Sequence, residues 1–262
     1  MSAVSAFLNY ISKDFSQQKL FLSKYPEFDG RGIKIAVIDG AVDLSLVGLQ
    51  KTSNGLPKII DCFDFSGAGD VDTSIIREMD DERCLIGLSG RKFKIPLKWK
   101  NPSQKWHLGL KSLLKPMTKL NEKLPEIDCI VWFNGKKWVA CIDTLKDGLE
   151  NAKVLTNFRD KHEYDILLFS QLELELCYCI TINNEGNLLQ IYTPYDEHAS
   201  FVIQVAAAYF PDKSDDQNGL APGAQIISMN IMNADDDLFI SALKQAVSFK
   251  HVYLSLIKTL SF

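Results

Sequence analysis

The chain has 262 residues, of which 46% are hydrophobic and 24% are charged, and its formal net charge is -4. This length and composition suffice for one large α/β domain or a domain with an insertion, and they exclude a mainly disordered chain. Because the charge is slightly negative and no basic cluster is present, nucleic acid is not an expected partner. The apolar runs are too short for a membrane span, and residues 3–11 lack the basic flank of a signal peptide.

Six cysteines are spread along the chain without a secretion signal, which is typical of reduced thiols in a cytoplasmic protein. Cys177 and Cys179 are two residues apart in an apolar run, so on a strand they share one face. No further ligand stands at metal-binding spacing, and we interpret both as small buried hydrophobic side chains. The sequence therefore predicts no metal and no cofactor.

A β-branched apolar run made of Ile33, Ile35, Val37 and Ile38 predicts a buried parallel strand. The run ends on Asp39. A carboxylate at the carboxyl end of such a strand lies where open α/β sheets place their functional sites. An aspartate that merely caps the strand or starts a turn explains this stretch equally well, and both interpretations stay open from the residues alone.

Residues 51–193 have a different pattern, with strands arranged as hairpins. Asn134-Gly135 separates apolar runs at 127–133 and 137–143, and this pair is the strongest short signal for a hairpin. A second pair of runs, at 177–182 and 188–193, flanks a turn. We assign the strand predicted at 58–65 to the same region, whereas 99–124 receives no assignment. The prediction is a β-rich insertion, 51–193, within an α/β domain formed by 1–50 and 194–262.

The α/β pattern returns after residue 194. Residues 201–210 have the apolar stripe of a helix, 225–231 form a strand, and 238–249 form a second helix. The acidic run Asp235-Asp236-Asp237 stands at the start of that helix, where it complements the helix dipole and needs no functional explanation. Residues 252–257 complete the pattern with another strand.

A strand ending in Asp39 and a helix starting near His198 resemble the subtilisin fold, in which the triad order is Asp, His, Ser. Five further stretches carry a more specific resemblance: Tyr25-Pro26-Glu27-Phe28-Asp29-Gly30-Arg31-Gly32, Gly87-Leu88-Ser89-Gly90-Arg91, Asp128-Cys129-Ile130-Val131-Trp132, Ala140-Cys141-Ile142-Asp143 and Asn218-Gly219-Leu220-Ala221-Pro222-Gly223-Ala224-Gln225. They are similar to the tripeptidyl-peptidase II family, whose members carry a long insertion between the catalytic aspartate and histidine. The resemblance implies an α/β fold with a subtilisin-like parallel sheet and flanking helices, incomplete at the carboxyl end, and a β-rich insertion.

By this resemblance Asp39 and His198 match the triad aspartate and histidine. Positions around them depart from the family: Asp-Thr-Gly becomes Asp39-Gly40-Ala41, and His-Gly-Thr-His becomes His198-Ala199-Ser200-Phe201. The family's strand Val-Asn-x-Ser-x-Gly becomes Val252-Tyr253-Leu254-Ser255-Leu256-Ile257, and the glutamate that anchors the substrate's amino group has no match. The sequence ends before the positions of the oxyanion asparagine and the nucleophilic serine.

The resemblance implies a cytosolic serine peptidase that removes tripeptides from free amino termini of peptides and forms large oligomers. Because Ser200 and Ser255 do not occupy nucleophile positions, we expect residues 1–262 alone to be inactive. The alternatives are a piece of an active enzyme and a catalytically dead binding or assembly partner. The expected partners are a second copy or a complete subunit of the tripeptidyl-peptidase II type. His107, His162, His251, Trp132 and Trp138 are expected to be structural or at the surface.

Overall fold

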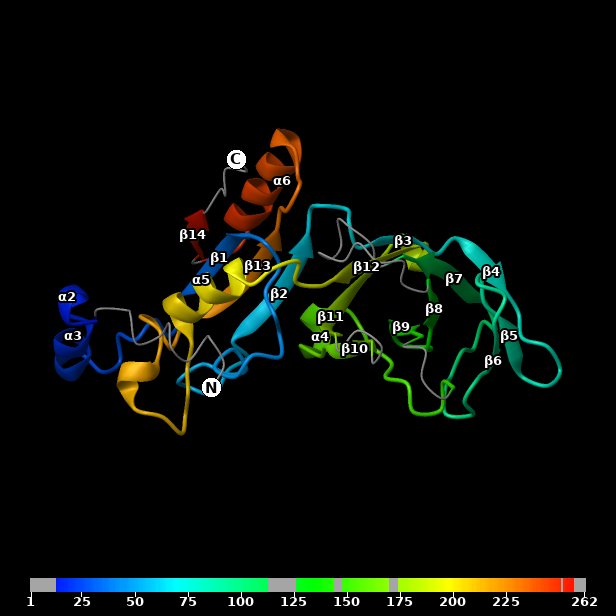
Figure 1. Cartoon of the computed structure of the whole chain (residues 1–262), viewed down its shortest axis with the longest axis horizontal. Coiled ribbons are helices and arrows are strands. Elements are labelled where there is room, and N and C mark those ends of the chain that lie inside the picture. Colours follow the sequence, from blue (N-terminus) through cyan, green and yellow to red (C-terminus); the bar gives the residue numbers. More distant parts are fainter. Residues whose placement is uncertain (1–12, 113–125, 144–147, 170–173, 251, 257–262) are drawn as a thin grey trace. The chain divides into compact units, whose positions relative to one another are not determined.

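The computed structural model describes residues 13–112, 126–143, 148–169, 174–250 and 252–256 (Figure 1). The chain forms two compact units, residues 1–66 with 196–262 and residues 67–195. Residues 3–11 and the part of the unassigned stretch 99–124 that follows residue 112 lie outside the described residues. No helix in the described part of the chain is both long and apolar enough to cross a membrane.

The first unit contains a four-stranded sheet in the order β14-β1-β13-β2. β1 pairs in parallel with β13 on one side and with β14 on the other, and β13 pairs in parallel with β2. The strands predicted near 33–39 and 225–231 therefore both belong to one parallel sheet, which agrees with the expected fold. The strands are β1 (Lys34–Asp39), β2 (Ile59–Asp64), β13 (Gln225–Asn230) and β14 (Val252–Leu256).

The position of β2 corrects the predicted boundaries of the insertion. The sequence pattern places this strand in the insertion over 51–193, but the strand belongs to the parallel sheet, and the second unit covers 67–195. Ile59 and Cys62 are only 4% and 3% exposed, so they contribute to the core of the first unit. The residues of a short strand beside a turn-rich connector do not indicate which strand it pairs with. The amino-terminal boundary of the insertion therefore could not be placed from the sequence.

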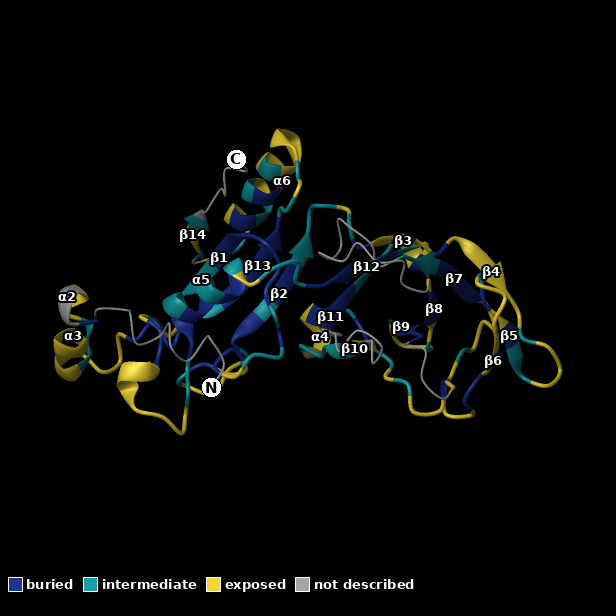
Figure 2. Cartoon of the chain, in the orientation of Figure 1, coloured by how far each residue is buried: buried dark blue, intermediate teal, exposed yellow. Residues whose placement is uncertain are grey.

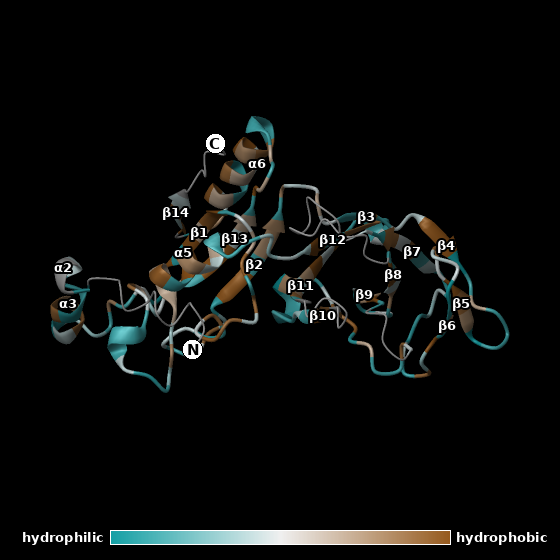
Figure 3. Ribbon diagram, in the orientation of Figure 1, coloured by the Kyte–Doolittle hydropathy of each residue, from teal (hydrophilic) through white to brown (hydrophobic). Residues whose placement is uncertain are grey.

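Two helices pack on this sheet: α5 (His198–Ala207) and α6 (Asp236–Val247). Ala242 and Ala246 of α6 form one hydrophobic cluster with Ala36 and Ile38 of β1. Figure 2 shows the two inner strands of the sheet, β1 and β13, as buried. Figure 3 shows hydrophobic residues along the same strands. α5 contacts β1 and β13 without joining that cluster. The short helices of this unit are α2 (Lys13–Ser16), α3 (Gln18–Lys24) and η3 (Asp215–Gln217).

The acidic run Asp235-Asp236-Asp237 stands at the start of α6, as expected from the sequence. Asp235 is the N-cap residue, and its side-chain oxygen accepts a hydrogen bond from the backbone N–H of Leu238 at 2.9 Å. Asp236 and Asp237 follow in the first turn, where their charges favour the positive end of the helix dipole.

The second unit consists of antiparallel sheets in the orders β10-β11-β12-β3, β4-β7-β8-β9 and β5-β6, with the helices α4 (Phe158–Lys161) and η2 (Asn184–Gly186). β8 and β9 form the predicted hairpin, and Gly135 in its turn has a φ of 94°. The strands are β3 (Asp70–Asp72), β4 (Ile75–Arg77), β5 (Cys84–Ile86), β6 (Lys92–Lys94), β7 (Trp106–Lys111), β8 (Ile127–Phe133), β9 (Trp138–Ile142), β10 (Asp165–Phe169), β11 (Leu174–Asn183) and β12 (Leu188–Tyr192).

Aromatic side chains fill one core of this unit. The rings of Trp99 and Trp132 stack with centroids 4.6 Å apart, and Trp106 from β7 packs beside them. His107 is buried, its Nδ1 lies 3.2 Å from the carbonyl oxygen of Thr73, and burial lowers its pKa. Trp132 and His107 therefore have the structural roles expected of them.

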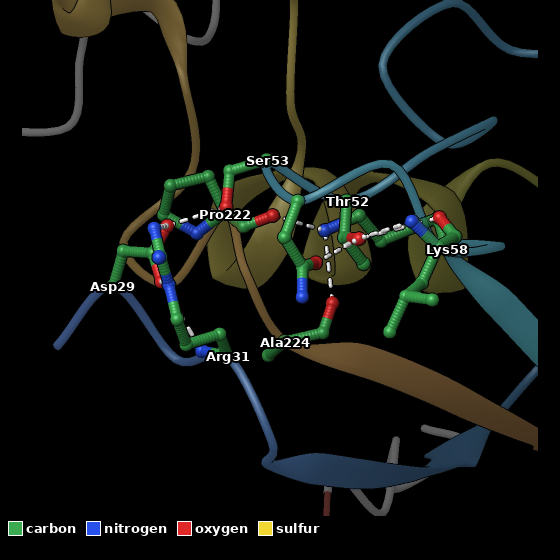
Figure 4. A network of polar contacts seen from close by, with 9 residues as sticks. Asp29, Arg31, Thr52, Ser53, Lys58, Pro222 and Ala224 are labelled. Atoms are coloured by element: carbon green, nitrogen blue, oxygen red, sulfur yellow. Dashed lines mark hydrogen bonds and ion pairs between the residues drawn. The ribbon is translucent and has the colours of Figure 1, made fainter. Parts of the chain in front are cut away.

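A polar network joins three connecting segments of the first unit (Figure 4). Lys58 is fully buried, and its Nζ donates hydrogen bonds to the carbonyl oxygens of Pro222 at 2.7 Å and Ala224 at 2.9 Å. Burial lowers the pKa of Lys58 to about 7, and the negative charge of Asp29 opposes that change only in part. The lysine thus fixes the turn that leads into β13.

Asp29 is the second centre of this network. Its carboxylate accepts hydrogen bonds from the Arg31 side chain at 2.9 and 3.2 Å and from the Ser53 hydroxyl. Burial disfavours the charge, but these donors outweigh it and hold the pKa of Asp29 below its usual value. A β-carbon at Gly223 would overlap the Asp29 carboxylate, so only glycine lets the two segments approach this closely.

The stability of the first unit should increase with pH because of Lys58. Below the folded-state pKa of about 7 this lysine is protonated in both states, and the folded state bears the cost of a buried charge. Between pH 7 and the unfolded-state pKa of 10.5 only the unfolded state keeps the proton, so the free energy of unfolding should rise by at most about 1.4 kcal/mol per pH unit. Urea unfolding at pH 7, 8 and 9 measures this slope.

Lys58→Met should flatten that slope, because methionine has no proton to lose. Lys244→Met removes an exposed lysine from α6 and serves as the control, whose slope should equal that of the unmodified chain. Identical slopes for the unmodified chain and Lys58→Met would show that Lys58 does not titrate in this range.

Candidate active site

The carboxyl end of β1 and the amino end of α5 meet in the first unit. β1 is an inner strand of the parallel sheet and ends at Asp39, and α5 begins at His198. The carboxyl ends of parallel strands form the edge at which open α/β sheets bind their ligands. On the neighbouring strands, Asn230 ends β13 and Asp64 ends β2. Their side chains bind each other, with Asn230 Nδ2 3.0 Å from Asp64 Oδ1.

Asp39 and His198 contact each other directly. The Nδ1 atom of His198 lies 2.9 Å from Oδ2 and 3.0 Å from Oδ1 of Asp39. The side chain of Asp39 is 1% exposed, whereas that of His198 is 40% exposed. The carboxylate is thus shielded from water while one edge of the imidazole remains accessible.

Further hydrogen bonds fix both members of this pair. The backbone N–H of Gly40 donates to Asp39 Oδ1 at 2.6 Å, which orients the carboxylate on its own strand. The backbone N–H of His198 donates to Asp196 Oδ1 at 3.1 Å, which holds the first turn of α5. Both donors are backbone N–H groups, and neither bond occupies the imidazole of His198, which therefore binds the Asp39 carboxylate.

The second imidazole nitrogen is available for chemistry. Asp39 carries no hydrogen to donate when ionised, so His198 Nδ1 carries the proton and Nε2 has the lone pair. Within the described residues Nε2 has no hydrogen-bond partner. A neutral imidazole held in this tautomer by a carboxylate can accept a proton at Nε2, which is the role of a general base.

The two serines considered from the sequence do not supply a nucleophile here. Ser200 is buried, and its hydroxyl oxygen accepts a hydrogen bond from the backbone N–H of Asp43 at 2.9 Å. Ser255 lies on β14 in register with Val37, before the end of the strand. Neither hydroxyl is hydrogen-bonded to His198 in the described structure.

The substitutions around the pair are compatible with its geometry. A β-carbon at Gly40 would lie 3.6 Å from Asp196 Oδ1 and from Met232 Cε, an ordinary contact. Ala41 is buried without a positive φ, so the loss of a glycine at this position causes no backbone strain. Tyr253 is 63% exposed on the edge strand β14, and Ile257 lies outside the described residues.

One group of possible metal ligands occurs in the described residues, away from this pair: Asp80, Glu82 and Cys84 in the second unit. The ammonium group of Lys92 lies 3.2 Å from Asp80 and 3.4 Å from Glu82. The ammonium group of the protein itself therefore already pairs with both carboxylates, and the group gives no support for a metal site.

Comparisons with known proteins agree with one another. Tripeptidyl-peptidase 2 from Caenorhabditis elegans is 34% identical over 84% of this chain and 20% of its own length. The same-named protein from Oryza sativa subsp. japonica is 33% identical over 80% of this chain, and that from Drosophila melanogaster is 25% identical over 80%. No protein-family model matches the sequence.

A solved structure supports the fold. The crystal structure of tripeptidyl peptidase 2 superposes with a TM-score of 0.68 at 21% identity, covering 87% of this chain and 23% of that one. The subtilisin-like fold expected from the sequence is thereby confirmed. The chain spans about a fifth of the length of the curated relatives it matches.

The tautomer of His198 should depend on Asp39. With the carboxylate present, long-range proton–nitrogen NMR of the neutral imidazole should show the hydrogen on Nδ1. In Asp39→Ala that hydrogen loses its acceptor and should move to Nε2. Asp43→Ala is the control, because Asp43 binds Ser45 rather than the imidazole. An unchanged tautomer in Asp39→Ala would mean that the contact does not persist in solution.

Proposed function

Because the chain belongs to the tripeptidyl-peptidase II family and matches its amino-terminal region, we propose that Asp39 and His198 form the acid–base pair of a subtilisin-like serine peptidase site. The observation that carries this proposal is the 2.9 Å contact between His198 Nδ1 and Asp39 Oδ2, with Nε2 left open. The name of the relatives, tripeptidyl-peptidase 2, suggests that the substrates are peptides from which tripeptides are released. The resemblance further implies that release takes place at free amino termini.

In this mechanism His198 Nε2 takes the proton of a serine hydroxyl as the oxygen attacks the peptide carbonyl. It then returns the proton to the departing amine. Asp39 stabilises the imidazolium that forms between these steps and keeps the ring in the productive tautomer. The buried position of Asp39 strengthens that interaction, because water screens it less than it would screen a surface pair.

The remaining parts of such a site would have to come from outside residues 1–262. Within this sequence no serine or asparagine matches the family's nucleophile or oxyanion donor, and Ser200 already serves as an acceptor for the Asp43 N–H. The chain on its own is therefore proposed to be inactive, since the general base has no hydroxyl to activate. The proposed compartment is the cytoplasm, in keeping with six cysteines that are all free thiols.

The alternative function is that of a catalytically inactive binding or assembly partner. β14 is an edge strand of the described sheet, and Tyr253 and Leu254 on it are 63% and 42% exposed. A cavity of about 550 Å³ lies beside the strand, and its lining includes Val247, which is 64% exposed. An unpaired edge with apolar side chains favours pairing with a further strand, either from a second copy or from a complete subunit of the tripeptidyl-peptidase II type.

Catalytic competence can be tested in a chimera in which residues 1–262 replace the matching region of the C. elegans relative. An active pair should support hydrolysis of a fluorogenic tripeptide amide with a free amino terminus. Asp39→Ala should then lower kcat by about 10⁴-fold and His198→Ala by about 10⁶-fold. Asp43→Ala is the control. A folded chimera without activity would contradict the peptidase proposal and favour the alternative.

The isolated chain should show neither hydrolysis of that substrate nor labelling by a fluorophosphonate serine probe. Labelling that a single Ser200→Ala or Ser255→Ala change abolishes would show that a nucleophile exists within residues 1–262.

The assembly alternative predicts that Leu254→Lys, which places a charge on the edge strand, lowers the molar mass measured by size-exclusion chromatography with light scattering. Val47→Lys is the matched control, because Val47 is 74% exposed in the same unit but lies outside β14. If the unmodified chain is already a stable monomer and does not bind the full-length relative, this alternative has no support.

A further inference from the structure

The second unit contains a cavity of about 330 Å³ that the peptidase proposal does not use. It lies between the segment that precedes β7 and the β8–β9 hairpin. The cavity, here called the lysine–tryptophan cavity, is lined by Lys98, Trp99, Lys100, Trp132, Asn134 and Lys136, together with two valines.

The indole rings form a fixed wall of this cavity. Trp99 and Trp132 stack at an interplanar angle of 19°, and Trp132 Nε1 donates to the backbone carbonyl oxygen of Lys100 at 3.0 Å. This bond holds the backbone of Lys100 in place. Trp99 and Trp132 are only 7% and 1% exposed, so their ring faces are not accessible for stacking by a base or another aromatic ring.

The charges of the lining residues have one sign. Lys98 donates to the carbonyl oxygen of Glu150, which leaves its positive charge without a carboxylate. Lys100 and Lys136 form no ion pair within the described part of the chain, whereas the adjacent Lys137 is paired with Asp160 at 3.0 Å. No acidic residue lines the cavity. It is therefore a local positive region on a chain whose net charge is -4.

The cavity wall also contains a donor without an acceptor. The Nε1 atom of Trp99 is buried and has no hydrogen-bond partner among the described residues. A buried indole N–H normally finds an acceptor, so the hydrogen-bonding capacity of Trp99 is not satisfied by the described residues.

The donors present favour carboxylates over phosphate. The lining contains no arginine to form a bidentate pair with a phosphate. The turn amides do not form an anion-binding nest either, since the N–H groups of Lys136 and Lys137 both donate to Asn134 Oδ1, at 2.9 and 3.0 Å. The remaining charged donors are the ammonium groups of Lys98, Lys100 and Lys136, each on its own flexible side chain. Separate ammonium groups can each bind one of several carboxylates spaced along a peptide.

We propose that the lysine–tryptophan cavity binds an acidic segment of a polypeptide, with Lys98, Lys100 and Lys136 contacting its carboxylates. This site is independent of Asp39 and His198, so it can exist whether or not the chain takes part in peptide hydrolysis.

Fluorescence anisotropy of a labelled hexaglutamate peptide tests this proposal on the full chain. Binding should be measurable at low ionic strength and weaken with added salt, because exposed charges are screened. The double variant Lys100→Gln/Lys136→Gln should weaken it by about tenfold or more. The control Lys161→Gln/Lys213→Gln removes the same charge from exposed positions outside the cavity and should bind like the unmodified chain.

Equal losses in the two double variants, or no loss in the first, would overturn the proposal. Circular dichroism establishes that each variant is folded. Inorganic phosphate and a single-stranded oligonucleotide are added as competitors. If either displaces the labelled peptide at lower concentration than unlabelled hexaglutamate does, the site is a general anion or nucleic-acid site and the assignment to an acidic polypeptide is wrong.

Discussion

The parallel pairing of β1 with β13 is the interaction on which the candidate site depends. Asp39 and His198 are separated by 159 residues, and local structure cannot bring them together. β1 fixes Asp39 at one edge of the sheet, and α5 contacts both β1 and β13 and so presents His198 at that edge. Most of the residues between them, 67–195, fold as a unit with its own sheets and its own core, so they can separate the pair in sequence without separating it in space. Lengthening such a connection adds little to the free-energy cost of closing it, because that cost grows only with the logarithm of the loop length.

Sequence patterns predicted the elements whose signals are local. The β-branched run of β1, the Asn134-Gly135 hairpin and the acidic start of α6 each follow from a few neighbouring residues, and the structure has all three. β2 was misassigned because membership of a sheet is decided by a distant partner, β13. The segment holding Trp99 and Trp106 received no assignment because prolines and lysines interrupt its apolar pattern, while its role depends on Trp132, far along the chain. Lys58 carried no signal at all, since a lysine beside a strand is normally exposed.

Buried carboxylates have two different roles in this chain, and their partners distinguish them. Asp29 is bound by Arg31 and Ser53, and in the second unit Asp128 and Asp143 are bound by Ser89 and Arg91. Their donors keep their hydrogens at neutral pH, so these contacts can only hold segments together. Asp39 instead binds an imidazole, whose second nitrogen can accept a proton while the first is held by the carboxylate. A carboxylate on a strand end is therefore ambiguous in sequence, and it becomes a candidate for catalysis only when its partner is known.

The distinction between structural carboxylates and Asp39 also applies to the residues that carry the resemblance to tripeptidyl-peptidase II. The stretches that carry it are largely those that form the two structural networks. Asp29-Gly30-Arg31 and Pro222-Gly223-Ala224 meet Ser53 and Lys58, and Gly87-Leu88-Ser89-Gly90-Arg91 meets Asp128 and Asp143. Gly87 and Gly223 belong to this set because a β-carbon at either position would overlap a buried carboxylate. These residues preserve packing, and the fold would require them with or without catalysis. The departures at Gly40, Ala41 and Phe201 lie instead beside Asp39 and His198, where the pair remains in contact. The likeness in sequence thus supports the fold, and the question of activity rests on His198 Nε2 and on what occupies the space beside it.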